Sequence, residues 1–157
     1  MRNDFANITF STSLEQNNLP IDSNSASPIA FPNNQNNQIP GFNHLNDAID
    51  RQGGDDRMAG QDCDDIVRGT TGNDTLWGNA GKDILLGNAG NNILLGNGGD
   101  DTLWGNADND TLWCGVGRDV LIGGSDRDIF ALKPQEGTDT IVDFNLSERD
   151  RIGLAGG

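Results

Sequence analysis

A nine-residue pattern of apolar and polar positions repeats through the second half of the chain, from residue 60 to residue 131. Its seventh and ninth positions favour Ile, Val, Thr, Leu and Trp, residues common in strands. Its eighth position is apolar in every unit: Val67, Leu76, Leu85, Leu94, Leu103, Leu112, Leu121 and Phe130. Because alternate side chains of a strand point to opposite faces, the pattern predicts a three-residue strand in each unit, with position 8 on one face and positions 7 and 9 on the other.

The first six positions of each unit have the composition of a turn. Positions 1 and 4 are usually Gly and position 2 is often Asn, as in residues 78–86 (GNAGKDILL) and 96–104 (GNGGDDTLW). Both residue types are expected where the backbone turns tightly or takes a positive φ. A single unit cannot bury its apolar residue alone, so such repeats stack. We expect two units to form one coil, and the coils to form two parallel sheets with the position-8 side chains between them.

The predicted fold is therefore all-β: a parallel β-roll, which is a two-sheet right-handed β-solenoid of nonapeptide repeats, with a disordered N-terminal segment. Residues 1–50 are rich in Asn and Gln and have no regular apolar period, so we expect this segment to be disordered or a linker. Helical spacing within residues 43–51 predicts one short helix at most. The degenerate unit 51–59 places the roll at residues 51–131, followed by a C-terminal capping segment at 132–157.

The net charge of −14 excludes some classes of partner. Such a surface repels nucleic acid and anionic lipid and attracts hard cations. The chain has no apolar run approaching the ~18 residues of a membrane span, so membrane insertion is not expected. Its first residues also lack the basic and apolar stretches of a general secretory signal.

The acidic residues are concentrated at position 6 of the repeat. Because turns alternate between the two edges of a roll, residues 18 apart share an edge. One edge is predicted to carry Asp65, Asp83, Asp101 and Asp119, and the other Asp74, Asn92, Asp110 and Asp128. Stacked strands lie ~4.8 Å apart, so an ion between two turns could take one side-chain oxygen from each. We expect these eight residues to bind several Ca²⁺ ions, which take six to eight oxygen ligands. The alternative is that Asp only caps the turns.

The repeats closely resemble the RTX, or hemolysin-type, calcium-binding nonapeptide family, whose pattern is Gly-Gly-x-Gly-x-Asp-x-apolar-x. The resemblance covers residues 60–131 strongly and 51–59 weakly. Residues 137–154 are similar to the sequence that commonly closes RTX arrays, through Asp139, Asp143, Phe144, Asp150 and Ile152. The resemblance implies Ca²⁺ binding and export by type I secretion, with an uncleaved C-terminal signal, and therefore an extracellular location.

Departures from the pattern change the expected sites locally. Asn92 removes a charge and should weaken the sites on either side of it. Asp108 and Asp126 occupy position 4, where Asp can adopt left-handed geometry at some cost. Cys63 and Cys114 lie on the same edge three coils apart, roughly 14 Å at the β-stacking distance. A disulfide needs Cα atoms within ~7 Å, so the two cysteines should not pair.

Position 9 predicts outward apolar columns on both faces of the roll. One face would carry Trp77, Leu95 and Trp113, and the other Leu86, Trp104 and Ile122. Such columns often mark contact surfaces, although the terminal segments could also cover one of them. Self-association or polysaccharide contact through Trp77, Leu95 and Trp113 is one expectation.

Two classes of function remain open. The first is a calcium-responsive module that folds on binding Ca²⁺. The second is a surface-binding or structural protein, such as an adhesin or a matrix or polysaccharide contact. No catalytic activity is expected, because the lone His44 lies outside a His-Glu-x-x-His motif and no Gly-x-Ser-x-Gly motif occurs. An accessory module of a secreted enzyme remains an alternative.

Overall fold

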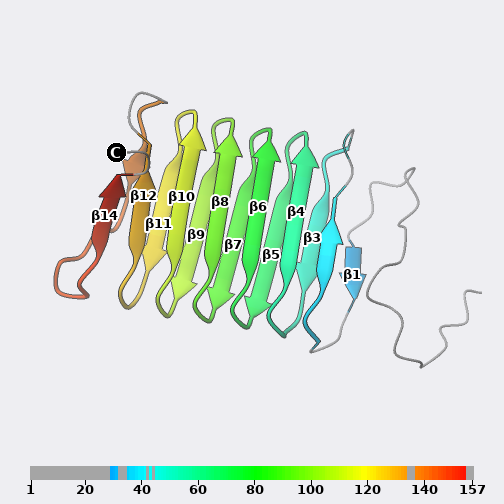
Figure 1. Cartoon of the computed structure of the whole chain (residues 1–157), viewed down its shortest axis with the longest axis horizontal. Coiled ribbons are helices and arrows are strands. Elements are labelled where there is room, and N and C mark those ends of the chain that lie inside the picture. Colours follow the sequence, from blue (N-terminus) through cyan, green and yellow to red (C-terminus); the bar gives the residue numbers. More distant parts are fainter. Residues whose placement is uncertain (1–28, 32–34, 42, 44, 134–136, 155–157) are drawn as a thin grey trace, which may run out of the picture.

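A computed structural model describes residues 29–31, 35–41, 43, 45–133 and 137–154. The chain winds as a two-sheet solenoid in which every strand pair is parallel (Figure 1). One sheet contains β1 (Ile29–Phe31), β3 (Ala48–Arg51), β5 (Ile66–Thr71), β7 (Ile84–Ala89), β9 (Thr102–Ala107), β11 (Val120–Gly124) and β13 (Thr140–Ile141), in that order. The other contains β2 (Gln38–Pro40), β4 (Arg57–Asp62), β6 (Thr75–Ala80), β8 (Ile93–Gly98), β10 (Thr111–Val116), β12 (Ile129–Leu132) and β14 (Arg151–Leu154).

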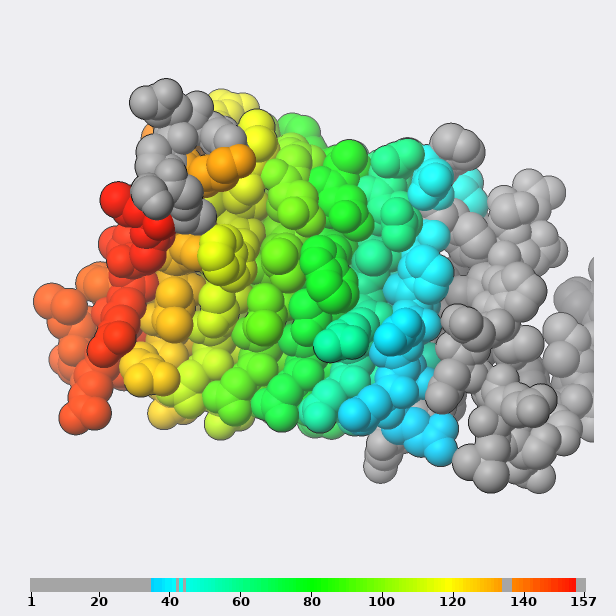
Figure 2. Space-filling view, in the orientation of Figure 1, coloured from blue at the N-terminus to red at the C-terminus, as the bar shows by residue number. Residues whose placement is uncertain are grey.

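The register repeats every 18 residues, which confirms that two units form one coil. Leu76 pairs with Leu94, and Leu94 with Leu112, along one sheet. Successive coils follow one another along the long axis of the molecule, as the colour bands of Figure 2 show. The predicted parallel β-roll is confirmed.

The position-8 side chains form the core between the two sheets. All eight, from Val67 to Phe130, have no exposed area. Ile39, Ile49 and Met58 extend the same core toward the N-terminus. At the other end, the Phe130 ring lies 6.1 Å from that of Phe144, measured between centroids. The prediction that position 8 faces inward and positions 7 and 9 outward is confirmed, and position 9 supplies the exposed Trp104 and Trp113.

The strands are longer than the three residues predicted. In β6 the strand covers positions 7, 8 and 9 of one unit and positions 1, 2 and 3 of the next. The turn is therefore confined to positions 4–6, and the predicted six-residue turn was wrong. Position 1 is buried inside the strand, because alternation carries it to the same face as position 8.

The described part of residues 35–51 contains strands. Where one short helix was predicted at 43–51, β3 occupies Ala48–Arg51, and no helix occurs among the described residues. The strands β2 and β3 pair in parallel with β4 and β5, so the solenoid begins before residue 51. The disorder expected for residues 1–50 falls in part on residues outside the described ones, and the described part of that segment contains β1, β2 and the start of β3. Nowhere in the described chain is there a helix long and apolar enough to cross a membrane.

Candidate metal site

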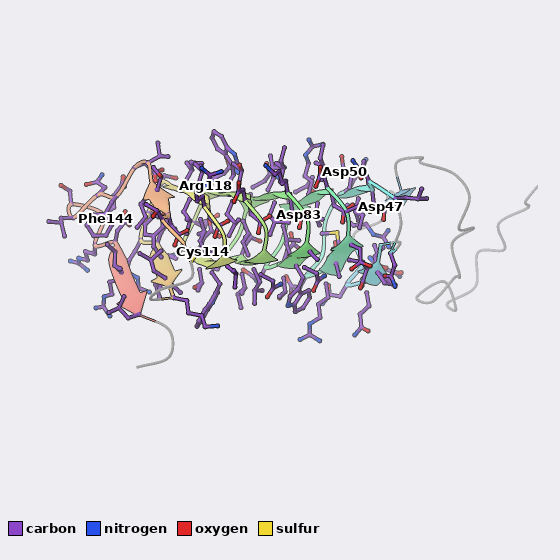
Figure 3. The ribbon with its side chains drawn as sticks, turned by 90° about the horizontal axis from the view of Figure 1, so that it is seen from above. Asp47, Asp50, Asp83, Cys114, Arg118 and Phe144 are labelled. Carbon is purple, nitrogen blue, oxygen red and sulfur yellow. The ribbon has the colours of Figure 1, made fainter. Side chains whose placement is uncertain are left out.

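Two columns of buried carboxylates run along the roll, one inside each edge. The position-6 side chains are 0 or 1% exposed in all eight predicted ligands: Asp65, Asp74, Asp83, Asn92, Asp101, Asp110, Asp119 and Asp128. Figure 3 looks onto a turn edge and shows Asp83 between the two sheets. The structure therefore brings the predicted residues together in two columns, as the 18-residue spacing required.

A repeated hydrogen bond fixes one oxygen of each carboxylate. The backbone N–H of Asp83 donates to Asp101 Oδ1 over 2.8 Å, and the N–H of Asp101 donates to Asp119 Oδ1 over the same distance. The same bond joins Asp110 to Asp128 at 2.9 Å along the other edge. Each position-6 residue thus donates through its backbone to the side chain one coil later, so both columns are continuous.

The second oxygen of each carboxylate has no hydrogen-bond partner although it is buried. These Oδ2 atoms belong to Asp56, Asp65, Asp74, Asp83, Asp101, Asp110, Asp119 and Asp128. A buried polar atom without a partner costs free energy, and a buried charge costs much more. Orphaned carboxylate oxygens that recur at the same place along the roll suit contact with a cation, because carboxylate oxygens can only accept.

The glycine at position 1 makes room for this oxygen. A Cβ added to Gly78 or Gly105 would meet Oδ2 of the Asp five residues later in the same unit. These glycines do not have positive φ, so the turn geometry predicted for position 1 was wrong. Positive φ occurs instead at position 2, as in Asn79 (φ 77°), and at position 4, as in Gly81 (φ 143°). At position 4, Asp108 adopts φ 74° and Asp126 φ 77°.

Asn92 indicates which backbone group lies beside the Oδ2 position of the other column residues. Its Oδ1 accepts from the Asp74 N–H at 2.9 Å, as the carboxylates do. Its Nδ2 takes the place of the second oxygen and donates to the carbonyl of Gly90, at position 4, over 2.9 Å. Because the units repeat the same backbone, a carboxylate at position 6 would place an acceptor where Asn92 places this donor. Two acceptors would then point at each other, an arrangement that a cation stabilises.

Burial raises the pKa of the column carboxyls. It raises the pKa of Asp65, Asp101 and Asp110 to about 7, against 3.8 for an ordinary Asp, and that of Asp74, Asp119 and Asp128 to about 6. The backbone hydrogen bond lowers each pKa, and repulsion from neighbouring carboxylates raises it again. Burial between the two sheets therefore disfavours the ionised form of these aspartates.

The columns extend past the eight predicted residues. Asp47 and Asp56 continue them toward the N-terminus, since Asp47 N–H donates to Asp65 Oδ1 and Asp56 N–H donates to Asp74 Oδ1. Asp139 and Asp150 continue them toward the C-terminus. Asp47 and Asp56 lie in phase with the repeat and could have been found by counting back in nines. Asp139 and Asp150 could not, because the chain between β12 and β14 breaks the period.

One of the comparisons with known proteins finds a match. Residues 60–94 and residues 95–130 each match the family model described as RTX calcium-binding nonapeptide repeat (4 copies). Residues 60–130 belong to this RTX family. No match for the chain is found among curated proteins or among solved structures.

The RTX segment is a calcium-binding β-roll, and its repeats are structural rather than catalytic. The residues present fit the ion. Calcium is a hard cation that takes carboxylate and carbonyl oxygens, and each coil offers unpartnered carboxylate oxygens beside glycine-rich turns. Both cysteines are free in the structure, Cys63 partly exposed and Cys114 buried.

Proposed function

We propose that the position-6 columns hold the Ca²⁺ ions, with ligands from Asp65, Asp74, Asp83, Asn92, Asp101, Asp110, Asp119 and Asp128. The observation that carries this proposal is the orphaned Oδ2 atom, which recurs in seven of these eight residues. The eighth, Asn92, satisfies the same place with its own amide. Asp47, Asp56, Asp139 and Asp150 are candidate ligands at the ends of the columns.

Calcium binding would then be coupled to folding. In the absence of a cation, assembling the roll stacks buried carboxylates that repel each other and whose Oδ2 atoms have no donors. A bound Ca²⁺ removes that cost only in the folded chain, because the unfolded chain does not bring residues 18 apart together. Binding free energy is in this way folding free energy, as in other metal-dependent domains.

The proposed place of action is the extracellular space, after export by type I secretion. Extracellular calcium modules bind with dissociation constants of roughly 10⁻⁴–10⁻³ M. A chain with this requirement stays unfolded while it is exported and folds once outside. The C-terminal segment closes the last coil of the folded roll, because Asp150 Oδ1 accepts from Asp128 N–H at 2.9 Å.

Far-ultraviolet circular dichroism of the full chain tests the proposal. We expect little β-structure in chelator, a cooperative gain on adding millimolar Ca²⁺, and a much smaller gain with equal Mg²⁺, which prefers rigid octahedral sites. Equal β-content in chelator and in Ca²⁺ would refute coupled folding. Isothermal titration calorimetry would separately give the number of bound ions.

A second candidate function rests on the position-9 columns. Trp77 pairs with Leu95, and Leu95 with Trp113, on one sheet, and Trp113 is 41% exposed. On the other sheet Leu86 and Ile122 flank Trp104, which is 40% exposed. A calcium-stabilised roll could present such a column to a polysaccharide, a matrix surface or a second copy. Binding to a glycan array by wild type but not by Trp113→Ser would favour this candidate.

A further inference from the structure

Cys114 is the one departure from Gly at position 1 between residues 60 and 131. It lies in β10, has no exposed area, and its Sγ lies 3.4 Å from the carbonyl oxygen of Ala131. In the other coils, a Cβ at this position would meet the orphaned carboxylate oxygen of the same unit. The thiol of Cys114 therefore occupies the space that glycine elsewhere leaves open beside a column carboxylate.

Two carboxylates surround this thiol. One ligand atom each from Cys114, Asp119 and Asp139 lies within 4.8 Å of the other two. Asp119 belongs to the same unit as Cys114, and its N–H donates to Asp139 Oδ1 over 3.2 Å. Asp139 reaches the column from the segment after β12, where the nine-residue period is broken. This group therefore arises from the closure of the roll and from one non-consensus side chain together.

A buried atom in the group lacks a partner. Asp119 is 1% exposed, and its Oδ2 accepts no hydrogen bond. The cluster thus contains an interior carboxylate oxygen without a donor, beside a second carboxylate and a sulfur. A proton alone would leave part of this negative charge uncompensated, whereas a divalent cation would contact all three groups.

The donor set differs in kind from that of the other coils. Calcium takes oxygen ligands, and a sulfur at the centre of a site does not suit it. Zinc binds Cys sulfur and carboxylate oxygen in tetrahedral sites, often with three protein ligands and a water. The sulfur–oxygen–oxygen set matches that pattern. We propose that Cys114, Asp119 and Asp139 form a site for a zinc-class divalent cation, which differs from the calcium sites of the repeat in its sulfur ligand.

Binding needs no reaction beyond loss of a proton. The Cys114 S–H, now near the Ala131 carbonyl, gives its proton to solvent, and the thiolate takes the metal. The ion would join β10, the turn before β11 and the segment before β13, since these carry its three ligands. It would therefore fasten the closing segment to the roll, a role that no internal coil requires.

Cys63 supplies a matched control. It is also a non-consensus residue at a glycine position, but it occupies position 4, with φ 80°, and is partly exposed. Among the described residues it belongs to no cluster with metal-ligand spacing. Replacing either cysteine by glycine restores the repeat consensus, so neither change is expected to disturb the coil. The two variants differ in whether they remove a proposed ligand.

The experiment titrates Co²⁺ into the full chain held in excess Ca²⁺, and then displaces it with Zn²⁺. Cobalt bound to thiolate gives a charge-transfer band in the near ultraviolet, and zinc binds more tightly than cobalt in the Irving–Williams order. We expect one equivalent of this band in wild type and in Cys63→Gly. Cys114→Gly should abolish it, and Asp139→Asn should weaken cobalt binding by more than about tenfold, the loss that even an outer-shell change can cause.

A missing band in wild type would overturn the proposal, as would a band that survives in Cys114→Gly or disappears in Cys63→Gly. Circular dichroism of the same samples separates this result from the calcium proposal, although the two share Asp119 and Asp139. Cys114→Gly should keep calcium-dependent β-structure whether or not cobalt binds. Failure of calcium to induce structure would count against the proposed function and leave the cobalt result to decide the thiol site.

Discussion

The backbone N–H of Asp83 donates to Asp101 Oδ1 across one coil, 2.8 Å away, while Asp101 Oδ2 in the same carboxylate has no partner. Oδ1 therefore holds two neighbouring coils together, and Oδ2 is available to bind a cation. This division explains why a single residue type at position 6 can both set the register of the coils and create a demand for a cation.

Asp101→Ala is expected to cost more calcium affinity than Asn92→Ala. Both substitutions remove an Oδ1 acceptor that bonds the coil before, at 2.8 Å for Asp101 and 2.9 Å for Asn92. Only Asp101→Ala also removes a charged ligand. We expect a difference on the order of tenfold in calcium dissociation constant, or about 1.4 kcal/mol, in calorimetric titrations. A greater loss for Asn92→Ala would contradict the assignment.

Asn92→Asp should strengthen calcium binding and weaken the calcium-free roll. The substitution replaces the Nδ2 that donates to Gly90 O with an acceptor, so the buried bond is lost at a cost of roughly 1–3 kcal/mol without calcium. With calcium, the new carboxylate completes the column. Calcium titrations followed by circular dichroism should show a steeper transition from a less ordered start.

Asn91→Asp is the control for this change in charge. Asn91 is exposed; its Oδ1 accepts from Asn109, a role that a carboxylate keeps, and the bond that it would lose, from Nδ2 to Asn73 Oδ1, is exposed as well. We expect its calcium transition to stay close to that of wild type. If Asn91→Asp and Asn92→Asp shift the transition equally, overall charge rather than the buried position would explain both.

Acidification should partly replace calcium. In the folded, calcium-free chain, burial raises the pKa of Asp65, Asp101 and Asp110 to about 7, whereas the unfolded value is near the ordinary 3.8. The folded chain then binds more protons than the unfolded chain between these pH values, so its stability rises as pH falls through about 7 and levels off below about 4. We expect β-structure in chelator to increase between pH ~8 and pH ~5.

Asp110→Asn checks the source of that pH dependence. The amide cannot titrate, and at Asn92 the same side chain satisfies the place by itself. This variant should hold more β-structure than wild type at pH ~8 in chelator and change less on acidification. Calcium-free spectra that do not vary with pH in wild type would show that the buried carboxyls do not limit folding.

Trp113→Ser should weaken any dimer formed through the column of Trp77, Leu95 and Trp113. A flat sheet face can pack on its twin with two-fold symmetry, and Trp113 is among the exposed side chains of this face. We expect calcium-loaded wild type to sediment as a dimer at tens of micromolar and Trp113→Ser as a monomer. Trp104→Ser, on the opposite sheet, should leave the dimer intact; a monomeric wild type would show that the column tolerates water or is covered.

Most of the fold and of the candidate site could be predicted from the nine-residue period of the sequence. A period of nine and strand alternation were enough to predict three features. These are the position-8 core, the placement of Asp83 and Asp74 on different edges, and the outward orientation of Trp113. The role of Gly78 did not, because sequence alone does not show that a Cβ there would meet the Asp83 carboxylate. In the sequence, a glycine that is needed to leave room for a neighbouring side chain cannot be told from one that is needed to adopt a positive φ.

The ends of the roll were the hardest to predict. The chain around β3 has few apolar residues, and only Asp47 and Ile49 preserve the phase, so pairing with β5 decides its conformation more than local propensity does. Asp139 lies 20 residues after Asp119 rather than 18, yet its carboxylate takes the column position. The folded chain accommodates the two extra residues, but counting in steps of nine along the sequence does not lead to Asp139.

The alternation of units between two sheets makes the surface depend on whether the number of units is odd or even. Loss of one nine-residue unit, such as residues 87–95, would leave the core and the turn pattern intact but transfer every later strand to the opposite sheet. Trp104 would then become the neighbour of Trp77, and Trp113 the neighbour of Leu86. Gain or loss of an 18-residue coil would only change the length. Repeat slippage in the gene could therefore redraw the outer faces of this protein in one step while preserving its interior.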